Sequence, residues 1–258
     1  MPYVGVGGLK QVGNQQREQM RAKRLAREIM FWLPAGMDLF DVQHSAPVAV
    51  ATMTNGENRI DSDAIDGWNA LLDTVEANAD VSALVVTGED RYWSTGLDLD
   101  HVEAMSNNET MAFMRKVDLV LGRLLTAPFI TVAALNGHTY AAGALLALAH
   151  DYRVMRQDQG FFCLPSVDVG IAFSPGMSSM ISSKLGQPIS HDLVVSGRRI
   201  GGLEAASTGV VTRAVASDQV LDVATEYAHA FSGKDPDVLA TVKRRMYSEA
   251  AGMLTVDP

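Results

Sequence analysis

The chain has 258 residues, 47% of them hydrophobic, which is enough for one large α/β domain with a substantial core. Its formal net charge is −9 and it has no dense basic tract, which excludes a surface that follows nucleic-acid phosphates. Because no apolar run approaches the ~20 residues of a membrane helix and there is one cysteine, we expect a cytoplasmic protein without a membrane partner, a disulfide or a metal site.

Residues 1–36 differ in composition from the rest of the chain. A glycine-rich stretch at 4–8 is followed by a polar, basic stretch at 11–27. Its glutamates, and the absence of a hydrophobic segment with a cleavage site, argue against a secretory signal. We interpret residues 1–36 as a peripheral extension and expect the folded core to begin at Met37.

The first half of the core alternates short strands with helices. The pattern predicts strands at 39–43, 48–53 and 82–87, a helix that starts at Asp61 and Ser62, a glycine-containing loop at 88–98, and helices at 101–105 and 109–125. The helical stretches carry apolar residues on one side, as expected for helices that pack on a sheet.

In residues 129–151 the spacing of the apolar side chains changes within a few residues from a period of about two, typical of a strand, to about 3.6, typical of a helix. The apolar run at 129–135 predicts a strand buried on both faces, and Asn136-Gly137 marks the break. From 141 to 149 all residues are small or leucine, which predicts a close-packed helix. Its first amides lack intrahelical partners, and Ala141, Ala142 and Gly143 are too small to shield them, so they can bind an oxygen that carries negative charge.

The second half contains two more short strands and then mostly helices. The pattern predicts strands at 152–155 and 161–164, helices at 175–185 and 190–195, a short helix feeding a strand within 201–211, and helices at 218–231 and 236–253. The sequence shows no clear internal period and no linker, so we expect one domain with a helical C-terminal region.

Two stretches together resemble a known family. The first is the run GEDRYWSTGLD at 88–98, and the second is NGHTYAAG at 136–143. This combination resembles the crotonase (enoyl-CoA hydratase/isomerase) superfamily. The longer run from Gly137 to Phe162, with CLPSVDVG after it, is similar to the 3,2-enoyl-CoA isomerase branch, notably its plant peroxisomal members. The resemblance covers roughly residues 37–250.

The resemblance implies a fold and an assembly. The expected fold is an α/β spiral of repeated ββα units at 37–200, followed by a helical trimerisation region at 201–258. The expected assembly is a homotrimer or a dimer of trimers.

The resemblance also implies a ligand and a set of site residues. The expected ligand is an acyl-CoA thioester, whose CoA is part of the substrate, with no separate cofactor. The thioester enolate is expected between the backbone amides of Leu97 and Ala142. Residues expected to border the substrate are Ser94, Gly96, Asp98, His138, Ala141 and Lys243.

The general base is the difficulty in this interpretation. Hydratases of the family use two glutamates, at positions held here by Leu145 and Ser166, and isomerases generally keep the second. A serine hydroxyl is not a base near neutral pH unless a neighbour takes its proton. Asp168 is the nearest substitute, about 7 Å from Ser166 on the same face if the segment is extended, although turn capping is an alternative role for it. His138 and Tyr140 are further polar groups within reach.

Three functions stay open at this point. The leading one is a 3,2-enoyl-CoA isomerase type of enzyme, with Leu97, Ala142, Ser166 and Asp168 as its catalytic residues. The second is a non-catalytic acyl-CoA binding protein that lost the glutamates. The third is a divergent reaction of the superfamily, such as thioester hydrolysis or decarboxylation. The Lys243-Arg244-Arg245 run either approaches the CoA phosphates or forms a solvated helix face.

Overall fold

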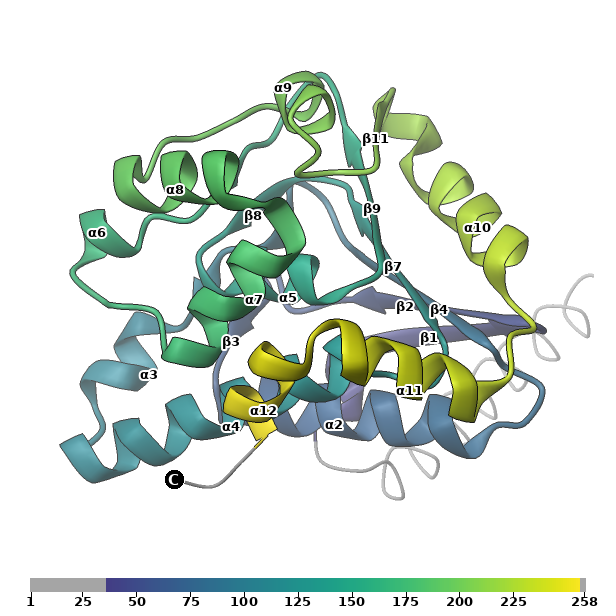
Figure 1. The fold of residues 1–258 in the computed structure, drawn as a ribbon, viewed down its shortest axis with the longest axis horizontal. Helices are drawn as coiled ribbons and strands as arrows, with labels where there is room; N and C mark the ends of the chain where they lie inside the picture. Colours follow the sequence, from purple (N-terminus) through teal and green to yellow (C-terminus); the bar gives the residue numbers. More distant parts are fainter. Residues whose placement is uncertain (1–35, 256–258) are drawn as a thin grey trace, which may run out of the picture.

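The computed structural model describes residues 36–255 (Figure 1). Except for Gly36, the predicted N-terminal extension lies outside this range. Within it, the main sheet has six strands in the order β1-β2-β4-β7-β9-β11. Their bounds are β1 (Phe40–Ser45), β2 (Val48–Met53), β4 (Ala83–Gly88), β7 (Ile130–Leu135), β9 (Tyr152–Arg156) and β11 (Arg213–Val215). β1 and β2 pair antiparallel, and all other neighbours in this sheet pair parallel.

Two smaller sheets and a set of helices complete the described part of the chain. The small sheets are β10 (Phe162–Cys163), β8 (His138–Tyr140) and β5 (Tyr92–Ser94) in one, and β3 (Arg59–Ile60) and β6 (Gly96–Leu97) in the other. The helices are α2 (Ser62–Ala77), α3 (Leu99–Glu103), α4 (Asn107–Leu125), α5 (Ala142–Ala149), α6 (Ser166–Val169), α7 (Pro175–Leu185), α8 (Gln187–Ser196), α9 (Gly202–Ser207), α10 (Val220–Phe231), α11 (Pro236–Met246) and α12 (Ser248–Thr255), with 3-10 turns η1 (Met37–Leu39) and η2 (Ser217–Gln219). No helix among residues 36–255 is long and apolar enough to cross a membrane.

The chain winds as a spiral of similar turns, as expected from the resemblance. Each turn places one strand in the main sheet, one in a small sheet, and then a helix, as in β4-β5 followed by α3 and α4, β7-β8-α5, and β9-β10-α6. Because successive turns pair parallel, equivalent corners of the spiral lie next to one another. The turn before α3 therefore lies next to the turn before α5. These two turns, called corners below, contain the motifs at 88–98 and 136–143.

The main sheet is covered on both faces, which explains its nearly continuous apolar strands. One face packs against α10, where Val220, Ala224 and Ala228 meet valines of β2, β4, β7 and β9. The other face packs against the interior of the spiral, including α2, α4 and α5. In Figure 1, α10 lies on one side of the sheet and α5 and α7 on the other. Two hydrophobic cores thus hold the spiral in place.

The structure adds to or differs from the sequence predictions at three places. A short strand, β8, lies between Gly137 and α5, because His138–Tyr140 pairs with both β5 and β10. The predicted single helix at 236–253 is two helices, α11 and α12, which meet at Tyr247, whose ring lies under the Lys184 ammonium at 4.7 Å. The segment after Pro165 is not extended but forms α6, which ends at Gly170 in the left-handed conformation (φ 69°).

His150, at the end of α5, is fully buried and has a strongly shifted pKa. Its Nδ1 lies 2.8 Å from the Leu146 carbonyl oxygen, and its ring meets the edges of Trp68 and Trp93. Burial lowers its pKa to about 3. The imidazole is therefore neutral in the folded protein at pH values where an unfolded histidine, with a pKa of about 6.5, already binds a proton.

We expect acidification from pH 7.5 to pH 5 to lower the free energy of unfolding by about 2 kcal/mol through His150 alone. The contribution is complete above the unfolded pKa of about 6.5 and is lost progressively as the pH falls toward the folded pKa. Urea unfolding at both pH values measures it. In His150→Asn, which keeps a donor for the Leu146 carbonyl but does not titrate, the loss should shrink by this amount. An equal loss in both proteins would contradict the assignment.

Candidate active site

A cavity of about 330 Å³ lies between the start of α5, the small sheets and the α6–α7 segment. All four residues predicted to be catalytic line it, namely Leu97, Ala142, Ser166 and Asp168. Much of the remaining lining is apolar: Leu99, Met114, Leu145, Ile171, Phe173 and Met177. The cavity therefore offers an apolar chamber with a few polar groups, as small-molecule sites commonly do.

The first amide comes from β6. The N–H of Asp98 donates to the Ile60 carbonyl oxygen at 3.0 Å, so the preceding N–H, that of Leu97, points away from β3 in this parallel pair. The corner is braced by Ser94, whose hydroxyl donates to the Asn58 carbonyl oxygen at 2.8 Å and accepts from the Gly96 N–H at 3.2 Å. These contacts fix the segment that carries Leu97, which lines the cavity.

The second amide belongs to Ala142, the first residue of α5, whose N–H has no partner within the helix. Ala141 before it has φ 50° and ψ −121°, a left-handed conformation that costs a residue with a Cβ on the order of 1–3 kcal/mol. The hydrogen bond from the Ala141 N–H to the Cys163 carbonyl oxygen, at 3.0 Å, helps to hold it there. This sharp turn between β8 and α5 places Ala141 and Ala142 in the lining of the cavity.

The two corners touch through their glycines. A Cβ added to Gly96 would lie 3.0 Å from the Ala142 nitrogen and 2.9 Å from the Ala141 Cβ. A Cβ added to Gly143 would lie 2.6 Å from the Ser94 carbonyl oxygen. The segment that carries Leu97 and the segment that carries Ala142 are therefore in contact, and both residues line the cavity. A pair of backbone N–H donors can stabilise an oxygen on which negative charge develops.

Ser166 and Asp168 reach the cavity from α6. Ser166 is 9% exposed, and its hydroxyl makes no hydrogen bond to another residue in the range 36–255. Asp168 is exposed, and its carboxylate lies so close to Gly197, at the end of α8, that a side chain there would collide with it. In a helix these two positions do not share a face as they would in a strand, yet both line the cavity.

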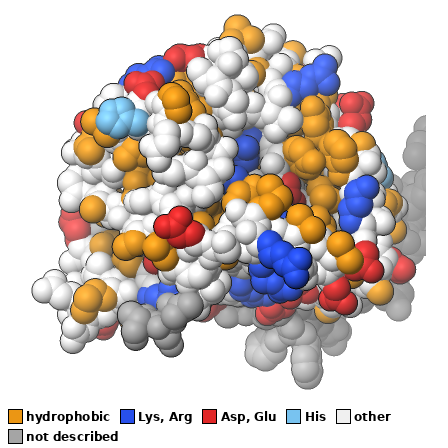
Figure 2. Space-filling view, in the orientation of Figure 1, with side chains coloured by type: hydrophobic (Ala, Val, Ile, Leu, Met, Phe, Trp, Pro, Cys, Tyr) orange, Lys and Arg blue, Asp and Glu red, His pale blue; other side chains and the backbone are white. Residues whose placement is uncertain are grey.

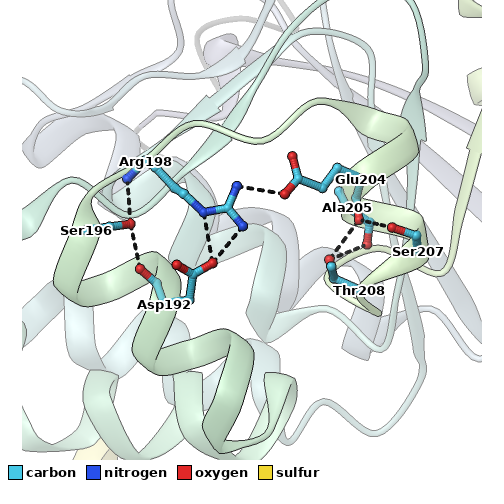
Figure 3. A network of polar contacts seen from close by, with 7 residues as sticks. All are labelled: Asp192, Ser196, Arg198, Glu204, Ala205, Ser207 and Thr208. Carbon is cyan, nitrogen blue, oxygen red and sulfur yellow. Dashed lines mark hydrogen bonds and ion pairs between the residues drawn. The ribbon is translucent and has the colours of Figure 1, made fainter.

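Arg198 ties the ends of α8 and α9 together next to the cavity (Figure 3). Its guanidinium pairs with Asp192 at 2.6 Å and with Glu204 at 2.7 Å. These hydrogen bonds lower the pKa of Asp192. They also hold the loop whose neighbouring residues, Gly197 and Arg199, line the cavity. Sequence analysis did not single out Arg199, because nothing local shows that the α8–α9 loop reaches the site.

Tyr140 and His138 project from the same face of β8, two residues apart. Tyr140 lines the cavity, and its hydroxyl oxygen lies 2.7 Å from Nδ1 of His138. The Arg199 guanidinium lies over the Tyr140 ring, 5.4 Å from its centre. His138 itself is not among the residues that line the cavity. It reaches the site only through Tyr140.

Three of the expected substrate-bordering residues make structural contacts within the protein. Ser94 is 1% exposed and braces the β6 corner. Asp98 caps α3 by accepting from the His101 N–H at 3.2 Å. Lys243 is 4% exposed, pairs with Asp151 at 2.7 Å and donates to the Phe129 carbonyl oxygen at 2.8 Å. Its ammonium is thus engaged inside the protein and does not face solvent, contrary to the expectation that Lys243 borders the substrate.

The neighbours of Lys243 behave differently. Figure 2 shows Lys and Arg side chains gathered on the surface over α11, where Arg244 and Arg245 are exposed. The run of three basic residues is therefore divided, one facing the core and two facing solvent.

Cys163, also in the cavity wall, donates its thiol to the Gly197 carbonyl oxygen at 3.1 Å. Burial raises the pKa of this thiol, so it stays protonated near neutral pH, as expected for an unreactive cysteine. Within residues 36–255, no group of three or more His, Cys, Asp or Glu side chains is placed to hold a metal ion.

Comparisons with known proteins agree with this architecture. Residues 43–255 match the model of the family described as enoyl-CoA hydratase/isomerase. Enoyl-CoA delta isomerase 3 of Arabidopsis thaliana is 30% identical over 207 residues, which cover 77% of this chain and 87% of that protein. The peroxisomal enoyl-CoA delta isomerase 2 of the same plant is 29% identical, with 79% and 89% covered.

Solved structures share the fold. The apo enoyl-CoA isomerase of Mycobacterium tuberculosis superposes with a TM-score of 0.77 at 24% identity, covering 84% of this chain and 94% of that chain. The enoyl-CoA hydratase EchA3 of Mycobacterium ulcerans superposes with a TM-score of 0.78 at 23% identity and the same coverage. At these identities the likeness concerns the fold alone.

Proposed function

The chain belongs to the enoyl-CoA hydratase/isomerase family, and from that premise we propose that it moves the double bond of a 3-enoyl-CoA to the 2-position through a thioester enolate. The observation that carries the proposal is the contact between the Gly96 and Ala142 corners at the head of an apolar cavity. This contact supports two amide donors, those of Leu97 and Ala142, acting on one oxygen.

The reaction needs stabilisation of negative charge on the thioester oxygen. When a proton leaves the α-carbon, its electron pair moves onto that oxygen, and two backbone N–H groups can donate to it. Each donor of this kind contributes about 3 kcal/mol of transition-state stabilisation. Because the amides are fixed by the corners of the spiral, they need no reorganisation during the reaction.

For the proton acceptor we propose Asp168. It is the only carboxylate among the described residues that line the cavity. Ser166 is proposed to contact the substrate through its free hydroxyl. Leu145 and Ser166 leave no pair of carboxylates to orient an attacking water, which favours isomerisation over hydration.

Asp168→Asn is expected to lower kcat for 3-enoyl-CoA isomerisation about 100-fold, because the amide cannot accept the proton. Ser166→Ala should change kcat by less than about threefold, since a hydroxyl contributes no base. Conversion of purified 3-enoyl-CoA to 2-enoyl-CoA measures both, with acyl-CoA affinity as the control. Full activity in Asp168→Asn would refute the assigned base. Saturable acyl-CoA binding without turnover of any thioester would instead favour the non-catalytic binding protein.

The finer points of the interpretation are also proposals. We propose that no cofactor is needed beyond the CoA of the substrate, that the protein works in the cytoplasm although a relative is named peroxisomal, and that it forms a homotrimer or a dimer of trimers. The division into a spiral core at 37–200 and an association region at 201–258 belongs to the same proposal. It is supported by three residues on one face of α11, Val238, Val242 and Met246, which are 61%, 45% and 67% exposed.

A further inference from the structure

The segment between α6 and α7 forms one wall of the apolar part of the cavity (Figure 1). Ile171, Ala172 and Phe173 line the cavity from this segment, and Met177 lines it from α7. Ala172 is exposed, whereas Ile171 and Phe173 are half-buried, so the wall has the cavity on one side and solvent on the other. An outward movement of residues 171–173 would therefore enlarge the cavity.

Few hydrogen bonds hold this wall in place. Among the described residues, its three members make one, from the Ile171 N–H to the Ser166 carbonyl oxygen at 3.1 Å, which anchors the α6 end. The other end of the wall is followed by Ser174. Its hydroxyl donates to Oδ1 of Asp118 on α4 at 2.9 Å and accepts from the Met177 N–H at 3.1 Å. Ser174 thus joins the wall to α4 and to the start of α7.

Asp118 occupies a position where an apolar residue would be expected. It is 9% exposed and lies on α4 between the buried residues Val117 and Leu121. Burial raises the pKa of its carboxyl, an effect that the Ser174 hydroxyl opposes. Because burying a carboxylate is unfavourable unless it is hydrogen-bonded, the contact with Ser174 accounts for its place there. Met114, one turn earlier on the same face of α4, lines the cavity, so this face borders both the cavity and the wall.

We propose that Asp118 is a positioning residue that, through Ser174, holds the wall at 171–173 against α4 and limits the length of the acyl chain that the cavity accepts. The inference rests on the acyl-CoA ligand of the proposed function and adds what restricts its size. The cavity of about 330 Å³ lies near the lower end of the range of about 300–1,000 Å³ that ligand sites span. The preferred ligands are therefore CoA thioesters with short acyl chains.

Loss of the Asp118 contact should free the wall without unfolding the helix behind it. The wall keeps its anchor at Ser166 and loses the one at α4. Ser174 still caps α7, because its contact with the Met177 N–H does not involve Asp118. The wall can then yield toward solvent, and a longer acyl chain gains buried methylene groups, each of which strengthens binding about fourfold.

The test measures the binding of hexanoyl-CoA and tetradecanoyl-CoA by calorimetry, which needs no turnover. The wild-type protein is expected to bind the longer chain no more tightly than the shorter one. We expect Asp118→Ala to raise the affinity for tetradecanoyl-CoA relative to hexanoyl-CoA about tenfold, with a melting temperature near that of the wild type. Asp118→Asn keeps an oxygen that accepts from the Ser174 hydroxyl and should keep the wild-type ratio.

Ser174 provides an independent variant of the same contact. Ser174→Ala should raise the affinity ratio as Asp118→Ala does. The double variant should raise it no further, because both changes remove one shared contact. Affinity ratios that multiply in the double variant, that change equally in Asp118→Ala and Asp118→Asn, or that change in neither would overturn the inference. A wild-type preference for the longer chain would overturn it as well.

The outcomes separate this inference from the proposed function. If the affinity ratios fail as described while the wild-type protein isomerises 3-hexenoyl-CoA, the role of Asp118 falls and the proposed function stands. If the ratios follow the expectation in a protein that isomerises no 3-enoyl-CoA, the role of Asp118 stands and the isomerase reaction falls. A wild-type protein that binds neither acyl-CoA would overturn both.

Discussion

Gly96→Ala is expected to lower the rate of 3-enoyl-CoA isomerisation by a factor on the order of 10³, because it separates the two amide donors. The added Cβ would lie 3.0 Å from the Ala142 nitrogen and 2.9 Å from the Ala141 Cβ, so one corner must move away from the other. Loss of a single donor of this type typically lowers the rate 10²- to 10³-fold. Steady-state kinetics with 3-enoyl-CoA measures the effect.

Gly209→Ala is the matched control. Gly209 also has a positive φ, 78° against 93° for Gly96, but a Cβ there meets nothing within 4 Å. Both variants share the backbone strain of alanine in the left-handed region, and only Gly96→Ala disturbs the cavity. Comparable activity in the two variants would contradict the assignment of the amides of Leu97 and Ala142 to one oxygen site.

Lys243→Ala is expected to lower the free energy of unfolding by about 3 kcal/mol, because it leaves a largely buried carboxylate without its cation. The Lys243 and Asp151 side chains are 5% and 15% exposed, and Asp151 also accepts from the Thr131 N–H and hydroxyl. Urea unfolding near neutral pH measures the change.

Arg244→Ala, one residue along α11 and exposed, is the control and should alter stability by less than about 0.5 kcal/mol. If Lys243→Ala were as stable as the wild type but bound acyl-CoA more weakly, the earlier expectation of a CoA contact at Lys243 would be correct after all. Equal stability of Lys243→Ala and Arg244→Ala would contradict the structural role.

The buried lysine belongs to a set of contacts that attach the C-terminal helices to the core. Lys243 joins α11 to Asp151 and to the strand start at Phe129. Arg115 on α4 donates to the Leu254 carbonyl oxygen at 2.9 Å, which attaches α12. Because the two helices reach the core at separate points, loss of one contact should loosen their docking without unfolding the spiral motif around the cavity.

Local patterns were sufficient for most of the elements. The apolar runs at 82–87 and 129–135 correspond to β4 and β7, and the small-residue run at 141–149 corresponds to α5. These predictions succeeded because burial imposes a period of two or 3.6 on residues that are adjacent in sequence. Gly96 and Gly143 could also be identified from the sequence, because a turn with no room for a Cβ requires glycine at that one position.

Contacts between distant segments could not be read in the same way. β8 consists of three residues and exists because β5 and β10 flank it, although they lie far away in the chain. Without that strand, nothing indicated that His138 and Tyr140 share a face. Likewise, Arg199 lines the cavity from the loop between α8 and α9, two helices that Arg198 joins through Asp192 and Glu204, and no local pattern indicates this.

The basic run on α11, Lys243 to Arg245, shows what the sequence alone determines and what only the tertiary structure decides. The order of residues predicted a helix that carries Lys243, Arg244 and Arg245, and the structure places these three residues in the last turn of α11. The sequence could not specify which of the three side chains meets the core, because that depends on where α11 docks on the rest of the protein. Docking is set by the summed packing of distant surfaces, and it placed Lys243 against Asp151 and left its neighbours in solvent.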